Sequence, residues 1–346
     1  MPRPRIIGPM RLLVLGGTVF LGRAVARLAH EQGHDVTCLA RGTSGAAVDG
    51  VRFVAGDRDR PDGLSAIDGE TFDAVVDVTV RPSHARHAAA ALAGRVGHYS
   101  YVSTCNVYSD DATPGQRAAT APLHDPAPPE IDDPRDGNMD MYGPCKVACE
   151  IAVRDGIGAD RVFLCRAGLI VGPEDRSDRF PYWVARMRRG GEVLAPGAPD
   201  ESVQFVDVDD LAAWLLLAGQ TGLAGAFDGK GLPMSRERFL KEMAAALAPE
   251  GTTLTWVDQD FLVARDVRPW SGERALPLWL PLPEYGGFLS RDTTASIAAG
   301  LAPRPVAETA RRTAAWLAAA PQEVRPGGLA AEDEAFVLRE WHARGV

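Results

Sequence analysis

Short apolar runs that suit buried strands recur along the first hundred residues of the chain. They lie at residues 10–15, 34–39, 51–55, 72–78 and 98–102. Nearly continuous apolar runs of this length are typical of strands covered on both faces, as at the centre of a parallel sheet. A helical stretch follows the first run and ends at about residue 30. The pattern therefore predicts an α/β fold with a parallel sheet.

A glycine-rich turn joins the first run to this helix: Gly16-Gly17-Thr18-Val19-Phe20-Leu21-Gly22. Glycine permits a tight turn and the close approach of a pyrophosphate, which then binds the free amides at the positive end of the helix. We predict a dinucleotide site with contacts from Gly16, Gly17, Thr18, Phe20, Leu21 and Gly22. Val19 stands where such turns usually carry their middle glycine, so we expect a narrower cleft or a shifted phosphate. The alternative is a glycine-rich turn that binds no ligand.

The end of the second run bears on the choice between the two nicotinamide cofactors. An acidic residue at this position accepts hydrogen bonds from the free ribose hydroxyls of NAD. Here Ala40 replaces the acid and Arg41 follows it, offering a guanidinium to the 2′-phosphate of NADP. We predict that NADP is preferred over NAD. The alternative is that Arg41 is a solvated loop charge.

Tyr142 and Lys146 lie four residues apart, in the segment Met-Tyr-Gly-Pro-Cys-Lys. On a helix, residues at this spacing share a face, so the phenol and the ammonium point to the same side. A nearby cation favours the phenolate, and we therefore expect the pKa of Tyr142 to be lowered from its usual value of about 10. Ser103 and Thr104 end the fifth apolar run and place a hydroxyl at the carboxyl end of a strand, where ligands bind in open α/β sheets.

In this order, these segments resemble the short-chain dehydrogenase/reductase superfamily, and within it the extended or atypical branch known as NAD-dependent epimerase/dehydratase. The resemblance also rests on Gly56-Asp57-Arg58-Asp59, on Arg166 through Gly172-Pro173, and on Gln204-Phe205-Val206-Asp207-Val208-Asp209-Asp210-Leu211. It implies a Rossmann-type doubly wound parallel sheet with a smaller C-terminal substrate lobe.

The resemblance also implies a role for each candidate site residue. Thr104 would bind the substrate oxygen, with Ser103 as the alternative, and Tyr142 would be the general acid or base. Lys146 would hold the nicotinamide ribose, and Asp57 and Arg58 would flank the adenine.

The resemblance further divides the chain into two parts. Residues 10–172 would form the dinucleotide-binding domain, to which residues 203–228 return, and residues 173–202 and 229–346 would form mainly the substrate-binding lobe and C-terminal helices. We predict helices at residues 293–301, 306–319 and 330–343. The long segment 109–139 is either a substrate lid or a surface excursion. Aromatic residues between 255 and 290 either cover the mouth of a pocket, which would fit a hydrophobic or aromatic substrate, or mediate self-association.

Two departures from the family narrow the chemistry. Dehydratases that act on nucleotide sugars carry an Asp-Glu pair just after the catalytic threonine, where this chain has Cys105 and Asn106. Nucleotide-sugar enzymes also tend to carry an arginine shortly before the Phe-x-x-Val-Asp-Asp segment, where this chain has Ser202-Val203-Gln204. We therefore favour a simple carbonyl reduction or alcohol oxidation over dehydration. Cys105 is either a proton donor in an epimerisation or a small buried thiol.

The composition fits a small-molecule enzyme without a nucleic-acid surface, because the 346 residues carry a net charge of −9 and a pI near 5.3. The five cysteines show no paired framework, and no histidine cluster suggests a metal site, so we expect reduced thiols and no metal. Residues 1–9 are too short and proline-rich for a signal peptide, and no stretch approaches the roughly 20 apolar residues of a membrane span. We expect a cytoplasmic protein, and the resemblance suggests a homodimer that forms through the helix carrying Tyr142.

Three functions follow in order of preference. The first is an NADPH-dependent reductase of a ketone or aldehyde on a small molecule, or an enzyme that catalyses the reverse oxidation, with Tyr142 as proton donor. The second is an epimerase of a sugar or nucleotide-sugar substrate that keeps NAD or NADP tightly bound. The third is a non-catalytic regulatory protein that binds NAD or NADP.

Overall fold

The computed structural model describes residues 8–135, 137–320 and 327–345, and its centre is a parallel sheet. Most of the segment considered as a signal peptide lies outside the described residues. All seven strands of the sheet run parallel. In spatial order they are β11 (Gly225–Gly229), β6 (Val162–Ala167), β5 (Val96–Thr104), β4 (Phe72–Asp77), β1 (Arg11–Leu15), β2 (Asp35–Ala40) and β3 (Arg52–Ala55). The five strands predicted from the apolar runs are confirmed.

The sheet is doubly wound, as predicted. The chain moves outward from β1 through β2 to β3, then returns to the other side of β1 and continues from β4 toward β11. The strand order reverses between β1 and β4, and the crevice at the carboxyl ends of the strands at such a point is the usual ligand site of open α/β sheets.

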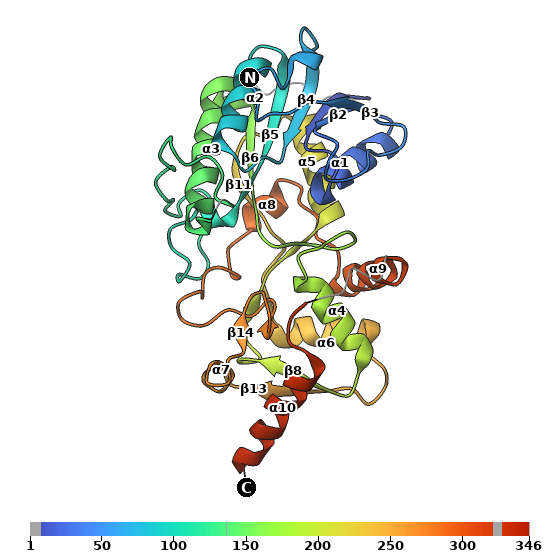
Figure 1. Ribbon diagram of the computed structural model, residues 1–346, viewed down its shortest axis with the longest axis vertical. Coiled ribbons are helices and arrows are strands. Elements are labelled where there is room, and N and C mark those ends of the chain that lie inside the picture. The colour runs from blue at the N-terminus through green and yellow to red at the C-terminus, as the bar shows by residue number, and fades with distance from the viewer. Residues whose placement is uncertain (1–7, 136, 321–326, 346) are drawn as a thin grey trace.

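Helices cover both faces of this sheet, as Figure 1 shows. Helices α1 (Phe20–Glu31) and α5 (Val208–Thr221) pack on one face, and α2 (Pro82–Leu92) and α3 (Tyr142–Ile157) pack on the other. In α1 the apolar residues Leu21, Val25 and Ala29 are buried at helical spacing. This periodicity lets the helix bury one side against the strands while its arginines stay at the surface.

A second core lies at the other end of the molecule, in the lower half of Figure 1. It is built from residues between 169 and 338 and includes the buried aromatics Phe180, Trp183, Phe239 and Trp279. Its elements include α4 (Arg179–Arg189), β8 (Glu192–Pro196), α6 (Arg236–Leu247), β13 (Thr253–Val257), α7 (Gln259–Val263), α9 (Val306–Ala319) and α10 (Ala331–His342). The helices predicted at 306–319 and 330–343 are confirmed, whereas the one predicted at 293–301 is the shorter α8 (Thr294–Ala298).

Short strand pairs and turns complete the structure. Strand β7 (Ile170–Val171) pairs with β10 (Val206–Asp207), β9 (Ser202–Val203) with β12 (Met234–Ser235), and β14 (Arg268–Pro269) with β15 (Ala275–Leu276). Single 3₁₀ turns are η1 (Ser65–Ile67), η2 (Cys105–Val107), η3 (Met139–Met141), η4 (Ala159–Arg161) and η5 (Ala343–Gly345). The first two pairs lie where the chain passes between the sheet and the second core.

Candidate functional site

The glycine-rich turn follows β1 at the reversal of strand order. Gly16 has φ 102°, a conformation that side chains rarely adopt, and its amide donates to the carbonyl oxygen of Leu39. A Cβ atom on Gly22 would lie 2.3 Å from the carbonyl oxygen of Gly16, so only glycine lets α1 approach the turn this closely. Helix α1 begins without a side-chain cap, which leaves its first amides available to an anion.

Val19, the departure from the family pattern, fits the backbone of the turn without strain. Its φ of −136° and ψ of 139° are ordinary extended values, and its side chain is largely exposed. Phe20 has φ 38°, so any backbone strain in the turn lies there. Val19 therefore affects a ligand through the volume of its side chain.

A groove of about 270 Å³ runs from this turn across the carboxyl ends of β1, β2 and β4. Five of the predicted cofactor residues line it: Gly16, Thr18, Arg41, Asp57 and Arg58. The other five, Gly17, Phe20, Leu21, Gly22 and Lys146, are not among the described lining residues, and the side chain of Leu21 is buried in the core beneath α1. The remaining lining residues are Val19, Leu39, Ala40, Gly42, Ser44, Gly56, Val78, Thr79, Val80, Arg81, His84 and Arg135.

Two arginines and a histidine surround Asp59 at one side of this groove. The carboxylate lies 3.6 Å from Nη1 of Arg41, 2.5 Å from Nη1 of Arg81 and 2.7 Å from Nε2 of His84. The hydrogen bond to His84 lowers the pKa of Asp59. Burial lowers the pKa of His84, which favours the neutral imidazole. Arg41 is about half exposed, and within the described part of the chain this long contact is its only ion pair, so it can turn toward a ligand in the groove.

Arg58 is fixed more firmly. Its Nη1 donates to both carboxylate oxygens of Asp77, at 2.9 and 3.0 Å, and Asp77 also accepts from the phenol of Tyr99 at 2.8 Å. Asp77 is fully buried at the end of β4. The guanidinium of Arg58 therefore forms a rigid wall of the groove, while the carboxylate of Asp57 accepts from the amide of Asp59.

The long segment before Tyr142 contributes to the rim of the groove. Asp132 accepts hydrogen bonds from the amide and the hydroxyl of Ser83, near the start of α2, and so caps that helix from a distance. Asp133 forms an ion pair with Arg81, and Arg135 lines the groove itself. The end of the segment thus packs against the groove, so this part of the segment is more than a surface excursion.

Lys146 lies one helical turn after Tyr142 on α3, and its ammonium is buried. Nζ donates to the carbonyl oxygens of Thr79 and Val102, at 2.7 and 2.6 Å, and lies 4.4 Å from the ring centroid of Tyr101. Burial lowers the pKa of Lys146 to about 8. These contacts tie α3 to the carboxyl ends of β4 and β5.

Tyr142 lies against Thr104, the last residue of β5. Burial raises the pKa of Tyr142, and the nearby hydroxyl of Thr104 lowers it by a smaller amount. The predicted lowering by Lys146 is therefore wrong in direction, because the Lys146 ammonium is directed to two backbone carbonyls. Thr104 also donates to Oδ1 of Asn106 and accepts from its amide.

Ser103 belongs to a different network, which separates the two alternatives left by the sequence. Its hydroxyl donates to Glu150 at 2.5 Å, and Glu150 forms a two-point ion pair with Arg166. Thr104 is thus the hydroxyl that the structure brings to Tyr142.

This network continues as a buried chain of alternating charges. Arg166 contacts the phenol of Tyr108 at 3.5 Å, Tyr108 donates to Asp228 at 2.8 Å, and Asp228 pairs with Arg291 at 3.1 Å. All these side chains are buried. Sequence reasoning used Arg166 only as part of a family segment and missed its partners, which lie on other elements.

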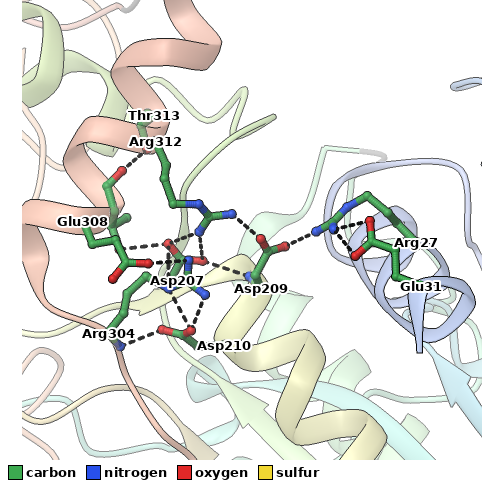
Figure 2. Close-up of polar contacts among 10 residues, drawn as sticks. Arg27, Glu31, Asp207, Asp209, Asp210, Arg304, Glu308, Arg312 and Thr313 are labelled. Carbon is green, nitrogen blue, oxygen red and sulfur yellow. Dashed lines mark hydrogen bonds and ion pairs between the residues drawn. The ribbon is translucent and has the colours of Figure 1, made fainter.

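A second network holds the segment Asp207-Val208-Asp209-Asp210, and Figure 2 shows its members. Asp207 caps α5 through the amide of Asp209 and accepts from Thr309 at 2.8 Å and from Arg312 at 3.1 Å. The carboxylates of this segment also bind Arg27 of α1, Arg304 before α9, and Arg312 of α9. This segment therefore joins α1, α5 and α9.

Among the described residues, no helix has both the length and the hydrophobicity needed to cross a membrane. Nor does the described part of the chain contain a group of three or more His, Cys, Asp or Glu side chains placed to hold a metal ion. The five cysteines are buried and unpaired.

One curated relative shares a short region with this chain. It is the photosystem II assembly factor Ycf39 of Synechocystis sp., which is 44% identical over 73 residues, or 20% of this chain and 22% of that protein. The match thus spans about a fifth of the length of that relative.

Solved structures resemble the chain over most of its length. A putative epimerase from Burkholderia cenocepacia covers 90% of this chain and 99% of its own, with 22% identity and a TM-score of 0.67. The Bordetella bronchiseptica enzyme WbmG in complex with NAD and UDP covers 90% and 95%, with 18% identity and a TM-score of 0.65. The UDP-N-acetylglucosamine 4-epimerase of Bacillus cereus covers 90% and 98%, with 16% identity and a TM-score of 0.63. At these identities the likeness shows the fold.

The family model described as NAD dependent epimerase/dehydratase family matches residues 12–91 and 83–227, more than half of the chain. The matched region contains the glycine-rich turn, Thr104, Tyr142 and Lys146. The chain belongs to the NAD-dependent epimerase/dehydratase family.

Proposed function

We propose that the protein is an oxidoreductase that reduces a ketone or aldehyde on a small molecule, with NADPH as the preferred cofactor and Tyr142 as the proton donor. The observation that carries the proposal is the contact between Tyr142 and Thr104 at the carboxyl end of β5. This edge of the sheet also holds the glycine-rich turn and the groove.

The bound nicotinamide would supply the hydride, and the protein would supply the proton and the orientation. Thr104 would hydrogen-bond the substrate oxygen, and Tyr142 would deliver a proton to the same atom. Because burial raises the pKa of Tyr142, the phenol carries its proton at neutral pH. A protonated phenol suits reduction better than oxidation, which needs a base. Lys146 would orient the nicotinamide ribose by exchanging one of its carbonyl partners for a ribose hydroxyl.

The preference for NADP is supported by the rim of the groove. Ala40 offers no carboxylate to the ribose of NAD, and Arg41 lines the groove with a partly exposed guanidinium. Ser44 lines the same region and supplies a hydroxyl. A 2′-phosphate would compete with Asp59 for Arg41 and would gain charge-assisted hydrogen bonds.

Two other functions each have a specific observation in their favour. An epimerase with tightly held cofactor fits the family description and the structural neighbours, although Cys105 and Asn106 replace the acidic pair of the related dehydratases. A binding role without net turnover fits the short match to an assembly factor.

We further propose that residues 10–172 with 203–228 form the cofactor unit, and that a homodimer forms through α3, on which Ile151 is an exposed apolar residue.

Titration of the purified protein with NADPH and NADH, followed by fluorescence, tests the cofactor assignment. Arg41→Ala should weaken NADPH binding by about 10- to 100-fold, because a hydrogen bond to a charged group contributes about 1.5–3 kcal/mol, and should change NADH binding little. Arg60→Ala is the control, since Arg60 is exposed and lies outside the described lining of the groove. If Arg41→Ala weakened the binding of NADPH and NADH equally, the argument for NADP would be removed.

Turnover tests the chemistry. A panel of ketones and aldehydes is supplied with NADPH, and Tyr142→Phe should lower the rate by about 100- to 10,000-fold, the usual contribution of general acid catalysis, with unchanged cofactor affinity. A variant with full activity would disprove the role of Tyr142. If no carbonyl is reduced but denatured protein releases NAD or NADP, the epimerase becomes the better assignment. If neither cofactor binds, a role that does not use NAD or NADP becomes the better assignment.

A further inference from the structure

Asp59 holds two arginines of the groove with one carboxylate. Its Oδ1 lies 2.5 Å from Nη1 of Arg81, and its Oδ2 lies 3.6 Å from Nη1 of Arg41. Both arginines line the groove, whereas Asp59 is not among the described lining residues. The carboxylate therefore stands behind the wall of the groove and neutralises charge that the two guanidinium groups would otherwise offer to a ligand.

The three residues come from the ends of three strands. Arg41 directly follows β2, Asp59 lies four residues after β3, and Arg81 lies four residues after β4, at the start of α2. The carboxyl ends of parallel strands meet at one edge of the sheet, where ligands bind in open α/β folds. Asp59 thus places a negative charge at the edge where the cofactor is expected.

Arg81 does not depend on Asp59 for its position. Its Nε and Nη2 also contact Oδ2 of Asp133, at 2.8 and 2.6 Å. Arg41 is held differently, because Asp59 is its one ion-pair partner among residues 8–135, 137–320 and 327–345. Neutralising Asp59 would therefore release Arg41 and leave Arg81 fixed.

The Asp59 carboxylate keeps its charge near neutral pH. The hydrogen bond with Nε2 of His84, at 2.7 Å, lowers the pKa of Asp59, and the charges of Arg81 and Arg41 lower it further, whereas partial removal from water opposes them. A phosphate monoester such as the 2′-phosphate of NADP carries about 1.5 to 2 negative charges at this pH. Two anions would then compete for Arg41.

We propose that Asp59 limits how strongly NADP is preferred over NAD, by competing with the 2′-phosphate for Arg41. The proposal deepens the cofactor assignment made above and rests on it. A phosphate bound to Arg41 would lie within about 6 Å of the carboxylate, since the present contact is 3.6 Å and a charge-assisted hydrogen bond spans about 2.8 Å. At that separation in water, a doubly charged phosphate and a carboxylate repel each other enough to weaken binding about 10-fold. The ribose hydroxyls of NAD are uncharged and escape this repulsion.

Calorimetric titrations of the full chain test this role without any substrate. The ligands are NADPH, NADH, adenosine 2′,5′-bisphosphate and AMP, so that each phosphorylated ligand has a partner without the 2′-phosphate. Asp59→Asn should bind NADPH and the bisphosphate about 10-fold more tightly than the wild type, and should bind NADH and AMP with little change. The gain should shrink at high salt, because the charges at this partly exposed site are screened.

Three variants serve as controls. Asp62→Asn removes the same charge three residues away, where the side chain is exposed and outside the described lining of the groove, and it should bind all four ligands like the wild type. Asp59→Glu keeps the charge and should show no gain. Asp59→Ser is a second neutral variant and should show the same gain as Asp59→Asn, which keeps the test independent of the folding of one variant.

The role of Asp59 would be overturned if the neutral variants bound NADPH and NADH with equal gains, if they gained nothing, or if Asp59→Glu gained as much. The wild-type titration separates this failure from that of the cofactor assignment. NADPH binding by the wild type without a gain in the neutral variants would keep the assignment and remove the role of Asp59. Binding of NADH alone by the wild type, with NADPH binding gained in the neutral variants, would do the opposite. If none of the four ligands binds, both fail.

Discussion

Replacing Arg312 with methionine should destabilise the junction between α5 and α9. Nη1 of Arg312 donates to both oxygens of Asp207 at 3.1 Å, and the Asp207 side chain is only 1% exposed. Removal of one partner of a buried ion pair costs about 3–5 kcal/mol when the remaining charge is uncompensated. Here Asp207 keeps Arg304 at 3.6 Å and Thr309 at 2.8 Å, and the Arg312 side chain is 30% exposed. We therefore expect the free energy of unfolding to fall by about 2 kcal/mol, within the range for hydrogen bonds to charged groups.

Urea unfolding of the full chain measures this change, with Arg311→Met as the control. Arg311 is the preceding residue on α9 and is exposed, so its replacement should change the free energy of unfolding by less than about 0.5 kcal/mol. If the two variants were equally stable, Arg304 and Thr309 would compensate Asp207 fully and the reasoning would be refuted.

The pH dependence of this fall in the free energy of unfolding, the stability deficit of Arg312→Met, provides a second check. Burial raises the pKa of Asp207 in the folded state, whereas Arg304 and Arg312 lower it. Loss of Arg312 would therefore raise it further. A carboxyl group with a raised folded pKa favours folding at low pH and loses that contribution as the pH rises through the folded value. The deficit of Arg312→Met should be largest near neutral pH and should shrink as the pH is lowered toward about 4.

Three further results are expected. In protein labelled with ¹³C-lysine, one of the three lysine signals should titrate with a midpoint near 8. This signal should be missing from Lys146→Arg. If the wild-type protein showed no such midpoint, the burial of Lys146 would be contradicted. Because that pKa is lowered on folding, Lys146 makes the folded protein more stable relative to the unfolded one as the pH rises from about 8 to about 10. Gly22→Ala should lower the midpoint temperature of thermal unfolding and weaken cofactor binding, because the new Cβ would lie 2.3 Å from the carbonyl oxygen of Gly16. An unchanged midpoint would show that α1 can shift freely. Glu150→Gln should lower the free energy of unfolding by about 3 kcal/mol in urea titrations, because it leaves the buried guanidinium of Arg166 without a counter-ion. A loss below about 1 kcal/mol would show that the other partners of Arg166 are enough to stabilise its charge.

Five of the seven strands of the central sheet could be predicted from the sequence because they are short, mainly apolar runs. Helix α2 could not, since its segment Pro-Ser-His-Ala-Arg-His-Ala-Ala-Ala-Ala-Leu is rich in alanine and shows no clear alternation between apolar and polar faces. Strand β11 was not predicted as a strand, because Gly225–Gly229 is short and contains Asp228. Its segment was expected only to return to the dinucleotide-binding domain. Its place at the sheet edge depends on pairing with β6, to which no local pattern points.

The sequence predicted which residues form the candidate site, but not which atoms these residues contact. Spacing showed that Tyr142 and Lys146 share a face of α3, but not that two carbonyl oxygens attract the ammonium. The choice between Ser103 and Thr104 depended on register, since a shift of one residue along a strand reverses the side to which each side chain points.

The buried chain of charges from Glu150 through Arg166, Tyr108 and Asp228 to Arg291 limits how this protein can be recombined with its relatives. These residues come from α3, β6, the segment after η2, β11 and the loop before α8. A chimera that takes its C-terminal half from another member would separate Asp228 from Tyr108, or Arg291 from Asp228, and would leave a desolvated charge unmatched. Exchange of substrate lobes should therefore succeed only when residues 108, 150, 166, 228 and 291 are transplanted as a set.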